Sequence, residues 1–189
     1  MTQVYLSLGT NLQPQHHLRC ALDALHARFG ELALSPVYQC APVGVSGADF
    51  LNLVVGLHTQ EAIFSLYSYT KAVEAYYRRT EPKHTKTYTR ALDIDLLTYG
   101  ETCAYQDGRQ LPCKTILQYD FILRPLADLA PHEYLPGQDA TYAQLWQTDA
   151  HPEQKLQQID FHWQPAHLWP QDPQLIAYLA ELTKAPVYT

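Results

Sequence analysis

The sequence predicts an α+β protein with a ferredoxin-like β-α-β-β-α-β core, an antiparallel sheet with packed helices, and a C-terminal extension. Two observations predict this fold. Short runs rich in Val, Leu and Tyr alternate with two longer segments in which apolar residues recur every three or four positions. Gly, Pro and Asn residues mark the junctions between these runs. Both helices would bury their apolar sides if they packed on one face of the sheet.

The first half of the chain supplies a strand, a helix and two further strands. Residues 4–8 are β-rich and end at a Gly-Thr-Asn turn, which predicts the first strand. Residues 17–29 have apolar side chains at helical spacing, and Gly30 follows where a C-terminal cap is expected. Residues 32–38 and 50–59 predict the next two strands, and the Gly- and Pro-containing segment between them predicts a loop.

The second half begins with a long amphipathic helix and a basic loop. Residues 61–79 have an apolar side of Ile, Leu, Tyr and Val, which is typical of a helix that packs on a sheet. Residues 80–89 are polar and cationic, which predicts a loop. The next predicted elements are a strand, a hairpin and a short helix, at residues 91–99, 101–111 and 125–130.

The length of 189 residues suits one domain with an appendage. We expect the domain to occupy residues 1–145. From residue 146 onward the composition shifts towards Trp and Pro. This shift predicts an extension over residues 146–189 that packs on the core and ends in a short helix near residues 173–184.

Composition excludes several classes of function. The net charge of −6, from 13 basic and 19 acidic residues, argues against a general nucleic-acid binder, because such proteins gain affinity by neutralising phosphates. No run of 18 uninterrupted apolar residues occurs, so no membrane association is expected. The N-terminus lacks a basic region followed by an apolar one, and the four cysteines show no CxxC spacing. We therefore expect a cytoplasmic protein with reduced thiols.

Two carboxylates form the sharpest local feature of the sequence. Asp93 and Asp95 lie two residues apart in a predicted strand, so their side chains point to the same face, about 7 Å apart. The two negative carboxylates repel each other unless a cation lies between them, and hard oxygen ligands favour Mg²⁺ or Mn²⁺. The alternative is the solvent-facing polar side of an edge strand.

Basic residues gather directly before this pair. Five of the 13 basic residues fall within 13 positions, at Arg78, Arg79, Lys83, Lys86 and Arg90. A solvated helix end would explain the first two, because cations favour helix C-termini, but not the other three. Beside two metal-type carboxylates, the cluster predicts a clamp for a polyphosphate. No GxxxxGK[ST] element occurs, so a P-loop is excluded.

Four segments in order resemble the 6-hydroxymethyl-7,8-dihydropterin pyrophosphokinase family, over about residues 2–130. Residues 5–12 resemble its opening strand and G-[ST]-N-L turn, and residues 35–44 its S-x-x-Y…P-x-G loop. Residues 49–52 resemble its [DE]-[FY]-L-N strand start, and residues 90–97 its R-x-[LI]-D-[LI]-D signature. The resemblance implies the transfer of pyrophosphate from ATP to a reduced pterin in folate biosynthesis, with two Mg²⁺ ions bound with ATP. The known fold of the family agrees with the element order above.

The resemblance also implies roles for single residues. Asp93 and Asp95 match the metal-binding pair, and with Arg79 and Arg90 they form the catalytic set. The expected nucleotide-binding residues are Glu74, Arg79, Lys83, Lys86, Arg90 and Tyr119. The expected pterin-binding residues are Cys40, Ala41, Pro42, Val43, Phe50, Asn52 and Phe121. Phe50 and Phe121 should face each other across a flat slot, with Asn52 at its edge.

The chain also departs from the family pattern. Tyr88-Thr89 stands where Gly-Pro is usual, Cys40 where threonine is usual, and Gln118 where histidine is usual. The stretch that follows is shortened to Tyr119-Asp120-Phe121. These departures leave an alternative open, a divergent homologue that binds a pterin or nucleotide with weak or altered transfer activity.

Overall fold

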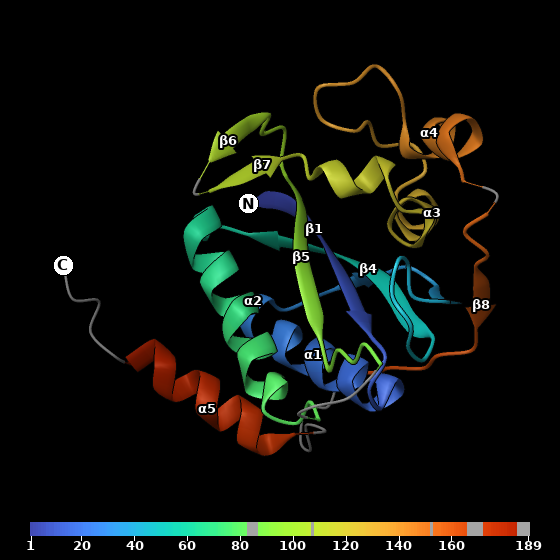
Figure 1. Ribbon diagram of the computed structural model, residues 1–189. Helices are drawn as coiled ribbons and strands as arrows, with labels where there is room; N and C mark the ends of the chain where they lie inside the picture. Colours follow the sequence, from blue (N-terminus) through green and yellow to red (C-terminus); the bar gives the residue numbers. More distant parts are fainter. Residues whose placement is uncertain (83–86, 107, 152, 166–171, 185–189) are drawn as a thin grey trace.

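The computed structural model describes residues 1–82, 87–106, 108–151, 153–165 and 172–184, and it shows a six-stranded antiparallel sheet with helices on both faces (Figure 1). This arrangement confirms the predicted combination of helices with an antiparallel sheet. Across the sheet the order is β5-β1-β4-β3-β8, and β2 also pairs with β4. The strands are β1 (Thr2–Thr10), β2 (Ala33–Leu34), β3 (Val37–Cys40), β4 (Phe50–Thr59), β5 (Asp93–Tyr99), β8 (Gln157–Ile159) and a separate hairpin of β6 (Ala104–Gln106) and β7 (Arg109–Leu111). The helices are α1 (Pro14–Phe29), α2 (Ile63–Arg78), a 3₁₀ turn (Lys114–Leu117), α3 (Asp120–Leu129), α4 (Tyr142–Asp149) and α5 (Pro173–Lys184).

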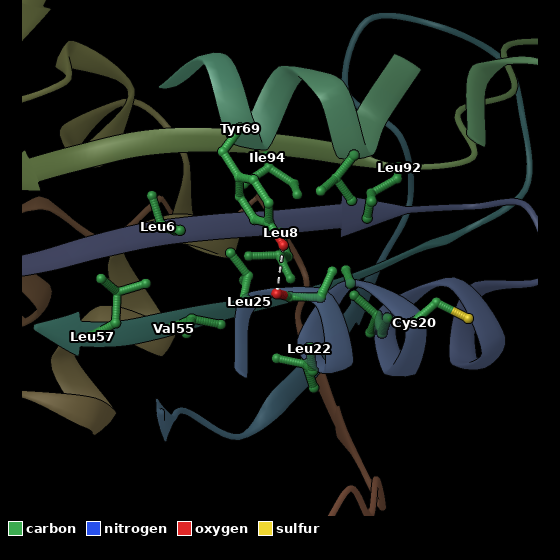
Figure 2. Close-up of a cluster of buried hydrophobic side chains, with 14 of the residues drawn as sticks. Leu6, Leu8, Cys20, Leu22, Leu25, Val55, Leu57, Tyr69, Leu92 and Ile94 are labelled. Carbon is green, nitrogen blue, oxygen red and sulfur yellow. Dashed lines mark hydrogen bonds between the residues drawn. The ribbon is translucent and has the colours of Figure 1, made fainter. Parts of the chain in front are cut away.

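The two long amphipathic helices, α1 and α2, pack on the same face of the sheet, as their apolar spacing predicts. Figure 2 shows the contact between them, where leucines of β1 and α1 meet residues of α2 and β5. Leu6 and Leu25 are fully buried, and each such side chain stabilises the fold by about 1.5–3 kcal/mol. Tyr69 of α2 donates a hydrogen bond of 2.7 Å to the Ala24 carbonyl of α1, which ties the two helices together (Figure 2).

A second apolar cluster covers the opposite face. Helices α3 and α4 pack there on Tyr5 of β1, Val54 of β4 and Leu97 of β5. Because both faces are covered, β4 is buried at nearly every position instead of at every second one. This double coverage explains the uninterrupted apolar run Leu53-Val54-Val55 in the sequence.

Two predicted elements differ from the structure, and one helix is absent from the prediction. The strand expected over residues 32–38 is divided into β2 and β3, because Pro36 has no N–H to continue the ladder. The helix expected over residues 125–130 begins at Asp120, so Pro125 lies inside α3 instead of at its start. Helix α4 was not predicted, although Thr141 and Gln144 form a capping box at its start.

The segment after α4 packs along the core. β8 pairs with β3 and so lengthens the sheet, and α5 lies against α1 and α2 (Figure 1). Trp163 Nε1 donates a hydrogen bond of 2.8 Å to the buried carboxylate of Asp23 in α1. The expected domain boundary at residue 145 falls within α4. In the part of the chain that the structure describes, no helix has the length and apolarity needed to cross a membrane.

Candidate active site

A cavity of about 340 Å³ opens at one end of the sheet. The strand register assembles its floor, because Gly9 of β1 pairs with Asn52 of β4 on one side and with Asp93 of β5 on the other. A Cβ at Gly9 would lie 3.1 Å from Asn52 Oδ1, so the glycine leaves room for this amide. The cavity is lined by all seven residues expected at the pterin, Cys40, Ala41, Pro42, Val43, Phe50, Asn52 and Phe121, and also by Asp93, Asp95 and Tyr119.

Aromatic rings form much of the cavity wall. Phe50 stacks on Tyr88, with ring centroids 6.1 Å apart and an interplanar angle of 28°. Tyr119 stacks on Phe121, with centroids 4.9 Å apart and an angle of 15°. Asn52 Nδ2 donates to Cys40 Sγ over 3.3 Å, and burial raises the pKa of the Cys40 thiol to about 11. Flat apolar walls beside the Asn52 amide suit a planar heterocycle that has a polar edge.

The two carboxylates of β5 lie on the cavity side of the strand. Asp93 and Asp95 line the cavity, while Ile94 between them points into the core. Burial raises the pKa of Asp93, and the nearby Asp95 raises it further. The Asp95 side chain is 47 % exposed, and its Oδ1 lies 3.6 Å from Lys71 Nζ. Both carboxylates therefore lie on the same face of β5, as their two-residue spacing predicts.

Lys71 and Glu74 of α2 hold the strand between these carboxylates. Ile94 N donates to Glu74 Oε1 over 2.7 Å, and Ile94 O accepts from Lys71 Nζ over 3.0 Å. The two side chains also pair with each other, with Lys71 Nζ 2.5 Å from Glu74 Oε1. Glu74 was expected on the nucleotide side, but it does not line the cavity and only 4 % of its side chain is exposed. Sequence reasoning missed Lys71, whose only signal was its position three residues before Glu74 on one helix.

Asn11 fastens the backbone that carries Arg90. Asn11 N donates to Arg90 O over 3.0 Å, and Arg90 N donates to Asn11 Oδ1 over 2.6 Å. Asn11 Nδ2 donates to Tyr88 O over 2.9 Å and to Ala48 O over 3.2 Å. One buried amide in the Gly-Thr-Asn turn thus connects three segments around the cavity, which gives that turn a physical role.

Arg79 lies away from the cavity. Its guanidinium carbon is 4.2 Å from the Tyr76 ring centroid, and its Nε donates to Tyr76 O over 2.9 Å. It lines a second hollow of about 520 Å³, together with His17 of α1 and Asp172 beside α5. In this structure Arg79 therefore does not line the cavity with Asp93 and Asp95, the residues with which it was expected to act. Lys83 and Lys86 lie outside the described residues.

The family model of 7,8-dihydro-6-hydroxymethylpterin-pyrophosphokinase (HPPK) matches residues 5–131, which include every wall of the cavity. The chain belongs to this family. A Porphyromonas gingivalis relative named 2-amino-4-hydroxy-6-hydroxymethyldihydropteridine pyrophosphokinase is 38 % identical over 136 residues, which cover 69 % of this chain and 92 % of the relative. A Pseudomonas aeruginosa protein with the same name is 34 % identical over 139 residues, covering 71 % of this chain and 84 % of the relative.

Solved structures of HPPK proteins have the same fold. The crystal structure of wild-type Plasmodium falciparum HPPK-DHPS with pteroate aligns with a TM-score of 0.63 at 14 % identity. The alignment covers 78 % of this chain and 42 % of that one, so this chain spans less than half of the two-part protein. At this level of identity the likeness concerns the fold alone.

Residues beyond the matched HPPK region support the shortened stretch beside the cavity. Asp120 N donates to Gln154 Oε1 over 2.9 Å, and Gln154 Nε2 donates to Gln118 O over 3.1 Å. The buried Asp120 carboxylate accepts from His151 N over 2.9 Å. Because Tyr119 and Phe121 flank Asp120, these bonds hold both rings at the cavity wall.

Proposed function

We propose that this protein transfers pyrophosphate from ATP to the hydroxymethyl group of 6-hydroxymethyl-7,8-dihydropterin, the reaction after which its relatives are named. One observation carries the proposal. Asn52 and the rings of Phe50 and Phe121 share one cavity with Asp93 and Asp95, so a flat acceptor and a metal-bound phosphate would meet there. The names of the relatives support transfer over the alternative of binding with weak or altered transfer.

The carboxylate pair fits magnesium bound together with a nucleotide. Among the described residues no three His, Cys, Asp or Glu side chains form a metal cluster. Mg²⁺ commonly binds through one or two carboxylates plus the phosphates of a substrate, so Asp93 and Asp95 are a sufficient protein contribution. Bound there, Mg²⁺ would offset the charge that develops on the phosphate oxygens. We propose two ions, both held between these carboxylates and ATP.

The residues of the cavity would position the two substrates. Phe50 and Phe121 stack on the pterin, and the Asn52 amide complements its polar edge. The pterin hydroxyl gives its proton to water as its oxygen forms a bond to Pβ, while the bond from Pβ to the α–β bridging oxygen breaks and AMP leaves with that oxygen. Arg90 donates to the phosphates as charge moves onto the leaving group. Tyr119 contributes to the nucleotide side, and Arg79, Lys83 and Lys86 would reach the phosphates only if their segment closes over ATP.

One assay tests the proposed reaction. The wild-type protein should release AMP from ATP only when both hydroxymethyldihydropterin and Mg²⁺ are present. Asp95→Asn should lower this rate by at least about 100-fold, because it removes a metal ligand at the reacting phosphates. Asp139→Asn, at an exposed residue that does not line the cavity, is the matched control and should keep full activity. Pterin binding without AMP release by the wild type would contradict the proposal.

Three finer points belong to the same proposal. The strand order β5-β1-β4-β3 supports a ferredoxin-like core, whose four strands here are β1, β3, β4 and β5 in chain order. As in such a core, the last of them, β5, lies beside β1, and β4 lies between β1 and β3. Residues 1–145 would form the catalytic domain and residues 146–189 an extension packed on it. We place the protein in the cytoplasm, where ATP is abundant and its four free cysteines stay reduced.

A further inference from the structure

Tyr88 lines the cavity and connects its aromatic wall to Arg90, which does not itself line the cavity. Its ring stacks on Phe50 at the pterin side, with centroids 6.1 Å apart. Its hydroxyl accepts hydrogen bonds from the guanidinium of Arg90, 2.8 Å from Nη2 and 3.2 Å from Nε. One side chain therefore touches both the aromatic wall and the cation expected at the phosphates.

The backbone of Tyr88 is held as firmly as its side chain. Its N–H donates to Ser46 O over 2.7 Å, and its carbonyl accepts from Asn11 Nδ2 over 2.9 Å. Gly47 allows this approach, since a Cβ there would lie only 2.5 Å from Tyr88 O. These contacts fix the backbone position from which the Tyr88 ring extends, although 39 % of the residue is exposed.

We propose that Tyr88 is a positioning residue that holds Arg90 for the phosphates of ATP and supports Phe50 against the pterin. This inference rests on the proposed function and adds a residue to it. An arginine side chain without such a partner would sample many rotamers and would lose that freedom on binding phosphate. Two hydrogen bonds to the Tyr88 hydroxyl restrict the guanidinium beforehand, so less freedom is lost when ATP binds.

The two contacts of Tyr88 can be removed separately. Tyr88→Phe keeps the ring and removes the hydroxyl, so it should weaken binding of a magnesium-bound, non-hydrolysable ATP analogue by about tenfold. The same variant should bind hydroxymethyldihydropterin within about twofold of the wild type, because the stacking face is unchanged. Tyr88→Leu removes both contacts and should weaken both ligands.

Calorimetry with each ligand measures this split without any turnover. Tyr105→Phe is the matched control, because Tyr105 is 73 % exposed on the β6–β7 hairpin and does not line the cavity. In an Arg90→Ala background, Tyr88→Phe should have no further effect on nucleotide affinity, since the partner of the hydroxyl is gone.

The possible outcomes separate this inference from the proposed reaction. Unchanged nucleotide affinity in Tyr88→Phe, or equal weakening of both ligands, would overturn the role of Tyr88 even if the wild type releases AMP. A tenfold nucleotide effect that persists in the Arg90→Ala background would also overturn it. If the wild type binds both ligands but releases no AMP, the proposed reaction fails while the split in Tyr88→Phe still decides the role of Tyr88. Failure of the wild type to bind either ligand would overturn both.

Discussion

Replacing Glu74, which is paired with Lys71, should destabilise the fold more than replacing Glu61, which is paired with Arg28 on the same side of the sheet. Glu74→Ala removes the partner of the Lys71 ammonium and leaves Ile94 N–H buried without an acceptor. Breaking a buried ion pair costs about 3–5 kcal/mol. Lys71 is 28 % exposed and can turn towards water, so we expect the lower end, about 3 kcal/mol. For a chain of this length, that loss corresponds to a fall in Tm of about 6–12 °C.

Urea unfolding measures this loss as a shift of the midpoint at unchanged slope. Glu61→Ala is the matched comparison, because both partners of its bidentate pair with Arg28 are partly exposed and can be solvated after the change, so it should cost less than Glu74→Ala. Adding Lys71→Met to Glu74→Ala should recover part of the stability, since the unpaired ammonium is then removed. A loss below about 1 kcal/mol in Glu74→Ala, or strict additivity with Lys71→Met, would refute this reasoning.

Three further predictions follow from contacts around the site and the extension. Burial and the nearby Asp95 raise the pKa of Asp93, so its ionisation should lower the stability of the ligand-free protein as the pH rises above 3.8, the ordinary pKa of an aspartate. Asp93→Asn should remove that loss and raise the urea midpoint at neutral pH, although it abolishes transfer. Gln154→Ala frees the backbone beside Phe121 and should raise KM for the pterin several-fold with little change in KM for ATP; an unchanged pterin KM would count against a supporting role. Trp163→Phe leaves the Asp23 carboxylate without this donor and should cost about 1–3 kcal/mol in urea unfolding, and a wild-type midpoint would disprove that estimate.

Local patterns in the sequence were enough to predict the core and one side of the site. Two-residue spacing placed Asp93 and Asp95 on one face of β5, and helical spacing identified the buried sides of α1 and α2. Helix α4 could also have been predicted, because the Thr141–Gln144 capping box is a local signal. Its omission was an error of interpretation and not a limit of the sequence.

The contacts of Lys71 and Tyr88 could not be predicted in the same way. Lys71 meets Asp95 only because α2 lies along β5, an arrangement that depends on the whole apolar layer beneath it. Tyr88 meets Phe50 only because two loops are fastened to each other through Asn11 and Ser46. These contacts join residues between 24 positions (Lys71 and Asp95) and 77 positions (Asn11 and Tyr88) apart, beyond the range over which periodicity or turn chemistry carries information.

The surroundings of Ile94 also determine which side chains of β5 face the cavity. Side chains in a strand alternate between two faces, so a shift of β5 by one residue against β1 would turn both carboxylates towards the core and Ile94 into the cavity. Among the described residues, β5 lies at the edge of the sheet and pairs with β1 on one side alone, which leaves its register less constrained than that of β4. Glu74 and Lys71 bind the N–H and the carbonyl of Ile94, so they tie this edge strand to α2, while the shift would replace the fully buried Ile94 side chain by a carboxylate in the apolar core. The Lys71–Glu74 pair therefore stabilises the edge strand, and the burial of Ile94 keeps Asp93 and Asp95 on the cavity side.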